Sequence, residues 1–389
     1  MSQRTVAGGQ GAGDVAIIGG GVIGCACAWA LARAGVSVTL YERVGLGTEA
    51  SGASAGILAP LAESAEPGPF AELGMAGLHA FAQEIDALVE ESGIDPEYRT
   101  CGVIRLALTE PEVPALQQAA AWQSNQSLGL RWIDSREVMA IEPALAPSFG
   151  ALYSAEEGMV RPPLLVRALA TAAARHGARI QEHSEVIGPA TTGGRVTGVR
   201  LGSGVVKPAG AVLLAGGAWS AALAGSAAPA IPVRPVKGQY AMLSIVPRPL
   251  RHVVFAGHGY LVPRVDGTLY AGATQEDAGY DRRVTLDGLA AVLDMARGIA
   301  PVLGNAEVIG SGAGLRPGSA DGLPILGAAP GIEGLYLATG HYRNGVLMSL
   351  ITARLMAALI LGEQPSIPLA PYSPMRHVQA VATGPALSS

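Results

Sequence analysis

The stretch Val15-Ala16-Ile17-Ile18-Gly19-Gly20-Gly21-Val22-Ile23-Gly24 decides the fold of this chain. Its four leading apolar residues predict a fully buried parallel strand, because they form a short run without polar alternation that stops at glycines. The following segment, Val22 to Ala34, is rich in alanine and predicts a helix that ends at Gly35, a residue that tolerates positive φ. Val36 to Tyr41 predicts a second strand, so the three elements indicate a right-handed βαβ unit.

The glycines of this unit have the spacing of a dinucleotide-binding fingerprint. Gly19 permits the turn, Gly21 lets the backbone approach a pyrophosphate, and Gly24 lets helix and strand pack closely. The helix N-terminus favours the phosphate charge. Glu42 ends the second strand about 20 residues on, where a carboxylate accepts hydrogen bonds from a ribose. The unit therefore predicts a dinucleotide site, but it does not choose between NAD and FAD.

Composition sets limits on the chain's partners. Its 389 residues fit one large or two medium domains. A net charge of −5, with no run of basic residues, argues against nucleic acid. Cys25, Cys27 and Cys101 have no metal-ligand spacing, so we expect no metal site and reduced cysteines in a cytoplasmic protein. The longest apolar run, Val346 to Leu361, contains Arg354 and is too short for a membrane span.

Two later segments return to the predicted sheet. Ala211–Leu214 is a buried strand that ends in Ala215-Gly216-Gly217, and Leu335–Ala338 is followed by a Gly-rich loop and a long apolar helix opening near Gly345. These returns resemble the glutathione-reductase type of FAD fold, in which distant segments close over one flavin. The N-terminus of a helix near Gly345 would direct its positive dipole at the flavin ring.

The remaining segments predict a second, inserted domain. Helices are expected at residues 70–92, 112–128 and 164–176, and a strand at 102–108. Residues 179–186 and 196–201 look like strands of a small meander, and 45–60 is a loop of small residues. From Val233 onward, the strand-like segments 239–245, 260–263 and 268–273 predict an antiparallel sheet.

Four stretches are more specific than the glycine fingerprint. They are Pro235-Val236-Lys237-Gly238-Gln239, Tyr260-Leu261-Val262-Pro263-Arg264, Ala313-Gly314-Leu315-Arg316-Pro317-Gly318 and Gly340-His341-Tyr342-Arg343-Asn344-Gly345. Together they resemble the hallmark stretches of glycine oxidases, the thiamine-pathway members of the D-amino-acid oxidase superfamily. The resemblance runs in register from about Asp14 to Pro371.

The resemblance implies roles for individual residues. Arg316 would pair with the substrate carboxylate, Arg343 would lie beside flavin and substrate, and Tyr260 would be the active-site tyrosine. His258 would correspond to the family's histidine two residues before that tyrosine and would be a catalytic residue; period-2 alternation would place it on the same strand face as Tyr260. With the fingerprint residues included, the expected FAD contacts are Gly19, Gly21, Val22, Ile23, Gly24, Glu42, Arg43, Ala50, Ser51, Ala55, Gly56, Ile57, Val186, Gly216, His341, Tyr342, Arg343, Asn344, Gly345, Val346 and Leu347.

The resemblance also implies an architecture and an assembly. The fold class is α/β, a glutathione-reductase-type FAD-binding Rossmann domain with an inserted α+β substrate domain on an antiparallel sheet. We assign residues 14–82, 145–230 and 310–365 to the FAD domain, 83–144 and 231–309 to the substrate domain, and 1–13 and 372–389 to flexible tails. The family usually forms homotetramers. Because no cysteine follows Cys101, we expect non-covalent FAD.

Simpler interpretations exist for these residues. Arg316 could be a surface arginine before a Pro-Gly turn, Tyr260 could be core packing, and His258 could be an ordinary solvated histidine. Arg343 sits where a helix is expected to begin, and a cation there opposes the helix dipole, which favours a functional role.

The expected activity is FAD-dependent oxidative deamination of glycine and other small amino acids, such as sarcosine and small D-amino acids. Oxygen would be reduced to hydrogen peroxide, and the imine could serve thiamine thiazole synthesis. One alternative is a D-amino-acid or sarcosine dehydrogenase that passes electrons to a quinone. More distant alternatives are a non-catalytic flavin-binding subunit and an NAD(P)-linked dehydrogenase.

Overall fold

Strand β1 (Asp14–Ile18) lies inside a six-stranded sheet of order β18-β19-β12-β1-β2-β8. The computed structural model describes residues 14–64, 66–126, 128–225 and 231–377. The other strands of this sheet are β2 (Ser37–Tyr41), β8 (Arg179–Gln181), β12 (Ala211–Leu214), β18 (Ile325–Ala328) and β19 (Leu335–Thr339). All neighbours are parallel except β18 and β19. The predicted βαβ unit and both later returns to the sheet are thus confirmed.

Both faces of the six-stranded sheet are covered. Val15 and Ile17 pack into a core with helices α1 (Val22–Arg33), α3 (Pro69–Ser92), α6 (Pro162–Arg175) and α9 (Ser349–Ile360). Ala16 and Ile18 point the other way, into a core with a three-stranded sheet of β9 (Val186–Thr192), β10 (Arg195–Leu201) and β11 (Val206–Pro208). A strand buried on both sides needs apolar residues at every position, which explains its continuous apolar sequence.

Glycines bring α1 against the sheet. A Cβ atom on Gly24 would lie 1.9 Å from the carbonyl oxygen of Gly19, and a Cβ on Gly19 would lie 2.5 Å from the oxygen of Ala215. Gly19 and Gly35 both have positive φ, 111° and 83°. The helix therefore begins directly over the carboxyl ends of β1 and β12, as the fingerprint predicts.

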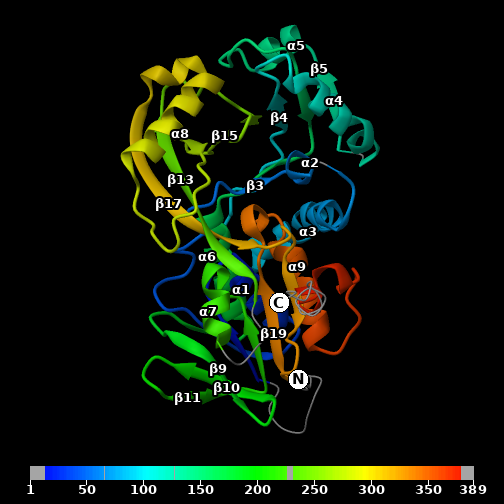
Figure 1. Ribbon diagram of the computed structural model, residues 1–389, viewed down its shortest axis with the longest axis vertical. Helices are drawn as coiled ribbons and strands as arrows, with labels where there is room; N and C mark the ends of the chain where they lie inside the picture. The colour runs from blue at the N-terminus through cyan, green and yellow to red at the C-terminus, as the bar shows by residue number, and fades with distance from the viewer. Residues whose placement is uncertain (1–13, 65, 127, 226–230, 378–389) are drawn as a thin grey trace, which may run out of the picture.

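A second sheet of eight strands forms the upper lobe in Figure 1. Its order is β17 (Glu307–Ser319), β13 (Val233–Ser244), β16 (Leu269–Gly272), β15 (Gly259–Pro263), β14 (Val253–Ala256), β4 (Val103–Leu106), β6 (Ala151–Ser154) and β5 (Arg131–Ile133). Long strands β13 and β17 run down from this lobe toward the six-stranded sheet (Figure 1). Helices α4 (Glu112–Gln123), α5 (Ser135–Ile141) and α8 (Leu286–Ile299) also lie in the upper lobe.

A short segment between the lobes is held by buried polar groups. It consists of β3 (Ile57–Leu58), which pairs with β7 (Gly158–Met159), and the single-turn helix α2 (Pro60–Glu63). The Glu157 carboxylate accepts the backbone N–H of Leu61 at 2.7 Å, and the guanidinium of Arg105 donates to the oxygen of Leu61 at 3.2 Å. Gln123 donates to the oxygens of Leu61 and Ser64. Side chains from the upper lobe thus fix the position of α2.

Several expectations for individual elements are wrong. Residues 179–181 form β8 at the edge of the six-stranded sheet, because they pair with β2 and not with the meander. The predicted helix at Gly345 begins only at Ser349, after a 3-10 turn at Tyr342–Asn344. Helix α4 ends at Gln123, and residue 127 of that prediction lies outside the described residues. The eight-stranded sheet is mixed, since β14 and β4 are parallel.

The expected boundaries cut through structural units. The limit at 82/83 falls inside α3, the segment assigned from 145 contains β6 of the eight-stranded sheet, and the limit at 309/310 falls inside β17. Of the expected tails, residues 1–13 and 378–389 lie outside the described residues. Residues 372–377 are not a loose tail, because Tyr372 is buried and its hydroxyl donates to the oxygen of Pro69 at 2.6 Å.

Replacing Gly24 by Ala should destabilise the protein, because the new methyl group would overlap the Gly19 carbonyl and push α1 off the sheet. We expect a loss of about 2–4 kcal/mol in unfolding free energy, in the range of severe core overpacking. The control is Gly298→Ala in α8, where a Cβ meets nothing within 4 Å. That change should stabilise by about 0.5–1 kcal/mol, since Ala is the better helix former. Urea denaturation measures both, and equal effects would contradict the packing argument.

Replacing Glu157 by Gln should change stability in a pH-dependent way. Burial raises the pKa of Glu157 from 4.5 to about 7, partly offset by the Leu61 N–H and by Arg105. The folded protein therefore keeps a proton that the unfolded chain loses, and wild-type stability falls as pH rises from 4.5 to 7. The Gln variant lacks this loss, so its advantage should grow to the order of 3 kcal/mol by pH 7.5. Exposed Glu156→Gln is the control, and a pH-independent difference would refute the prediction.

Candidate active site

Two pockets meet where α1 begins. The central pocket is lined by residues from α1, β15, β17 and the 341–346 loop, and the strand-end pocket lies over the carboxyl ends of β1, β2 and β12. They share the residues Gly21, Ala50, Ser51, Ala215 and Gly217. The two pockets are therefore parts of one continuous site that passes the N-terminus of α1.

Glu42 fixes the geometry of the strand-end pocket. Its carboxylate accepts the backbone N–H of Gly20 at 2.8 Å and that of Val44 at 2.9 Å, and the residue is 8% exposed. A carboxylate has about four acceptor positions, so both oxygens can still accept hydroxyl groups. The guanidinium carbon of Arg43 lies 4.0 Å from the centroid of the Trp219 ring, and Arg43 also pairs with Glu49.

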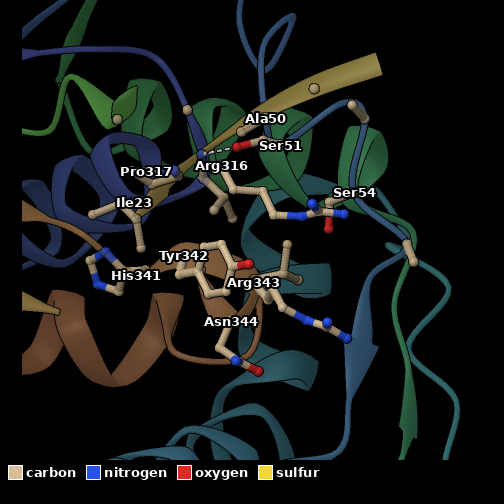
Figure 2. Close-up of a pocket in the computed structure, with 18 of the residues that line it drawn as sticks. Ile23, Ala50, Ser51, Ser54, Arg316, Pro317, His341, Tyr342, Arg343 and Asn344 are labelled. Atoms are coloured by element: carbon tan, nitrogen blue, oxygen red, sulfur yellow. Dashed lines mark hydrogen bonds between the residues drawn. The ribbon is translucent and has the colours of Figure 1, made fainter. Parts of the chain in front are cut away.

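The N-terminus of α1 fits a phosphate. Its N-cap is Gly21, no acidic side chain occupies the first turn, and only the Ser51 hydroxyl lies within 4 Å of a Cβ built on Gly21. The Ser51 hydroxyl accepts the N–H of Val22 at 3.0 Å (Figure 2). The backbone and the positive end of the helix dipole are therefore open to a negative group. With Glu42 on one side and the central pocket on the other, the site suits a dinucleotide with an extended ring system.

Arg316 enters the central pocket from β17 (Figure 2). It lies over Gly238 of β13, where a Cβ would be 2.2 Å from its Nη2 atom, so only glycine leaves room for the guanidinium. Nη1 donates to the oxygen of Thr274 at 3.0 Å. Nearby Glu276 is held by Lys237 and Gln239. Among the described residues Arg316 has no carboxylate partner, so it offers its remaining N–H donors to a ligand.

Arg343 enters the same pocket from the 3-10 turn after β19, and its charge is already balanced (Figure 2). Its Nη2 atom lies 3.1 Å from Oε1 of Glu63, at the end of α2. Burial alone would lower the pKa of Arg343, but the charge and hydrogen bond of Glu63, together with Tyr260 and Tyr342, outweigh burial and raise the pKa. The guanidinium carbon also lies 6.0 Å from the Tyr260 ring centroid. Arg343 thus remains charged while its carboxylate partner is part of the protein.

Two further titratable residues of the pocket, Tyr270 and His341, are uncharged. The Tyr270 ring stacks against Tyr260 and Tyr240 at centroid distances of 6.2 and 4.7 Å, and its hydroxyl donates to the oxygen of Ala53. Burial raises the pKa of Tyr270 well above its usual value. Burial also lowers the pKa of His341 to about 3, and its Nε2 lies 3.0 Å from the Thr352 hydroxyl. An anion in this pocket therefore has Arg316 as its available charged partner.

The structure brings most of the expected site residues together. In the central pocket these are Gly21, Val22, Ile23, Ala50, Ser51, Ala55, Gly56, Ile57, Tyr260, Arg316, His341, Tyr342, Arg343, Asn344, Gly345 and Val346. In the strand-end pocket they are Gly19, Gly21, Glu42, Arg43, Ala50, Ser51, Val186 and Gly216. Gly24 and Leu347 line neither pocket: Gly24 packs α1 onto β1, and Leu347 is buried beneath the loop.

His258 does not share a strand face with Tyr260, so that expectation is wrong. Strand β14 ends at Ala256 and β15 begins at Gly259, and Ala256 pairs with Gly259. Gly257 and His258 are therefore the exposed two-residue turn of a hairpin, with Gly257 at φ 54°. The period-2 argument fails because the chain reverses between the two residues. His258 is absent from both pocket linings.

Sequence reasoning missed several lining residues. Glu63, Tyr270 and Gly238 contribute to the central pocket, and Trp219 and Glu49 to the strand-end pocket. One signal could have revealed the need for Glu63, since a carboxylate partner offsets the free-energy cost of removing an arginine from water. Nothing in the sequence says which acid supplies it.

Comparison with known proteins agrees with this geometry. Glycine oxidase from Geobacillus kaustophilus is 36% identical over 372 residues, which cover 95% of this chain and 98% of that protein. The bifunctional protein ThiO/ThiG from Synechocystis is 35% identical over 377 residues, covering 95% of this chain and 55% of that protein. The crystal structure of glycine oxidase from G. kaustophilus matches with a TM-score of 0.90 at 35% identity, covering 96% of this chain and 100% of that one.

The comparison confirms the family resemblance and the α/β flavoprotein fold expected from the sequence. The profile of the family described as FAD dependent oxidoreductase matches residues 14–359, which include both lobes and both pockets. With a fingerprint, a terminal acid and a continuous site that fit FAD, the chain belongs to the FAD dependent oxidoreductase family.

Proposed function

We propose that this protein catalyses the FAD-dependent oxidative deamination of glycine and other small amino acids. The observation that carries the proposal is the difference between the two pocket arginines. Arg343 is paired with Glu63, while Arg316 has no carboxylate partner among the described residues. One free guanidinium beside a balanced ion pair suits a substrate with a single carboxylate.

Arg316 would bind the substrate carboxylate in two-point geometry. Its Nη1 contact with Thr274 fixes the plane of the guanidinium, so the carboxylate and the attached α-carbon take a defined orientation. Tyr260 lines the same pocket and is a second candidate contact for the substrate. This positioning converts binding energy into the alignment that the reaction needs.

FAD held by the N-terminus of α1 and by Glu42 would supply the redox chemistry of the reaction, as acceptor of a hydride equivalent from the α-carbon. The chain itself offers a pocket whose His341 and Tyr270 are neutral. No protein base is needed if the amine binds deprotonated. The role of the chain is then orientation and a fixed electrostatic field, with the charge of Arg316 opposing that of the carboxylate.

Further parts of the proposal follow from the resemblance to glycine oxidases. Oxygen is the proposed acceptor and is reduced to hydrogen peroxide. The imine hydrolyses to the 2-oxo acid or serves thiamine thiazole synthesis, as the name of the ThiO/ThiG relative suggests. We propose non-covalent FAD and assembly as a homotetramer. The three free cysteines suit a cytoplasmic location. Among the described residues, no helix is long and apolar enough to cross a membrane.

A substrate panel scored by flavin absorbance tests the activity. Under anaerobic conditions glycine, sarcosine and D-alanine should each bleach the flavin of the purified holoenzyme, and air should restore the colour with release of peroxide. Bleaching without peroxide, but with reduction of a soluble quinone, would indicate a dehydrogenase. No bleaching by any small amino acid would refute the proposal.

Replacing Arg316 by Leu should raise KM for glycine about 10- to 150-fold, because a charge-assisted hydrogen bond contributes about 1.5–3 kcal/mol. Arg316→Lys should recover part of the loss, since it restores the charge but not the fork. Weak turnover of ethylamine, which has no carboxylate, should not change by a similar factor. Arg297→Leu in α8 is the control for loss of a surface arginine. Steady-state kinetics of the three variants and the wild type with glycine and with ethylamine measure these effects. An unchanged KM for glycine in Arg316→Leu would exclude the assigned role.

A further inference from the structure

A third cavity, distinct from the two pockets, is lined by arginines. We call it the arginine cavity, and its lining includes Arg99, Cys101, Met159, Arg248, Arg251 and Arg264. It lies where the end of β15 meets β7 and the segment before β4. Its lining shares no residue with the central or strand-end pocket. No acidic side chain belongs to the lining of this cavity.

Arg264 forms the floor of the arginine cavity. It is 4% exposed, and its Nη1 donates to the oxygen of Val160 at 3.2 Å and contacts the sulfur of Met159 at 3.7 Å. Among the described residues no carboxylate pairs with it, and its Nε and Nη2 atoms have no recorded partner. Arg264 nevertheless belongs to the lining of the cavity. A buried cation without a carboxylate partner is costly, and an anion bound in the cavity would offset that cost.

Arg99, Arg248 and Arg251 are exposed and also line the cavity. Arg248 donates only to the oxygen of Arg264, at 3.4 Å, and Arg99 pairs with Asp95. The other acids close to this region are engaged elsewhere. Glu97 and Asp266 pair with Arg161, and Glu142 accepts hydrogen bonds from the backbone of Arg251 and from His252. Asp95 balances the charge of Arg99, and Glu97 and Asp266 also act on Arg264 from outside the lining. Among the described residues, no carboxylate forms an ion pair with Arg248, Arg251 or Arg264, so the lining keeps a net positive charge.

We propose that the arginine cavity is a second anion site, separate from the active site, that binds a phosphate group. Guanidinium groups from separate segments approach the space from its floor and from its rim. A tetrahedral phosphate presents acceptor oxygens in several directions and can meet such a set, whereas a planar carboxylate is satisfied by one arginine fork. Burial lowers the pKa of Arg264 to about 10, so its charge persists at neutral pH and would be stabilised by the anion.

The site lies behind the active-site wall. The guanidinium carbon of Arg264 is 5.6 Å from the ring centroid of Tyr270, whose other neighbours Tyr260 and Tyr240 stack on it. Tyr270 lines the central pocket, so one aromatic ring separates the two anion sites. The phosphate could be inorganic phosphate or the head of a phosphate monoester, since both present the same group.

Calorimetric titration of the FAD-loaded enzyme with inorganic phosphate tests the site. Saturable binding is expected, and Arg248→Gln and Arg251→Gln should each weaken it at least about tenfold, as for loss of a charge-assisted contact. Both residues are exposed, so these variants should fold. Arg264→Met should abolish binding, and thermal unfolding checks its folding. Exposed Arg297→Gln is the matched control and should bind like the wild type.

Two comparisons define the ligand. Glycerol 3-phosphate binding more tightly than inorganic phosphate would indicate a phosphorylated metabolite, and the reverse would indicate free phosphate. Either result supports the site if the Arg248 and Arg251 variants lose it. Succinate binding more tightly than phosphate would overturn the phosphate assignment. Absence of saturable binding would overturn the site, as would phosphate binding that is lost in Arg316→Leu and kept in Arg248→Gln, because the anion would then occupy the active site.

Discussion

The close contact between helix α1 and the strands beneath it is the constraint on which the rest of this structure depends. A Cβ atom on Gly24 would lie only 1.9 Å from the carbonyl oxygen of Gly19. A Cβ atom on Gly19 would in turn lie 2.5 Å from the oxygen of Ala215, in the turn after β12. Only glycine allows this approach. It places the helix N-terminus over the strand ends, where Glu42 and the Gly216 turn also converge. The dinucleotide site is therefore a consequence of backbone packing more than of any single polar side chain.

The central pocket contains one cation that the protein balances and one that it does not. Two cations enter it, and the protein neutralises one of them internally through Glu63. If both arginines were free, the pocket would favour dianions, and if both were paired, it would bind no carboxylate. The neutral state of His341, caused by its burial, keeps a further positive charge out. This balance leaves one guanidinium without a carboxylate partner among the described residues, which suits a ligand with a single carboxylate.

Features encoded locally could be predicted from the sequence, and features that depend on distant pairing could not. The βαβ unit and its glycines were predictable because strand, helix and turn signals lie within thirty residues of each other. The Arg343–Glu63 pair was not, because 280 residues separate its members. The error at His258 has a local cause: a two-residue hairpin turn at Gly257 interrupts the alternation that was assumed to continue. Strand β8 was misassigned because a short strand carries no signal of its partner. Family resemblance supplied Arg316, for which composition and periodicity gave no reason.

The pocket's charge balance also joins the two lobes. Arg343 follows β19 of the six-stranded sheet, but Glu63 belongs to α2, whose backbone is held by Glu157, Arg105 and Gln123 of the upper lobe. Any shift of the upper lobe therefore moves Glu63 relative to Arg343. Loss of their 3.1 Å contact would leave a second unpaired cation in the pocket, which is costly when it is largely buried. The ion pair thus favours the arrangement of the lobes in which Glu63 balances Arg343, while Arg316 has no carboxylate partner among the described residues, so that the packing of the lobes and the charge balance of the pocket depend on the same contact.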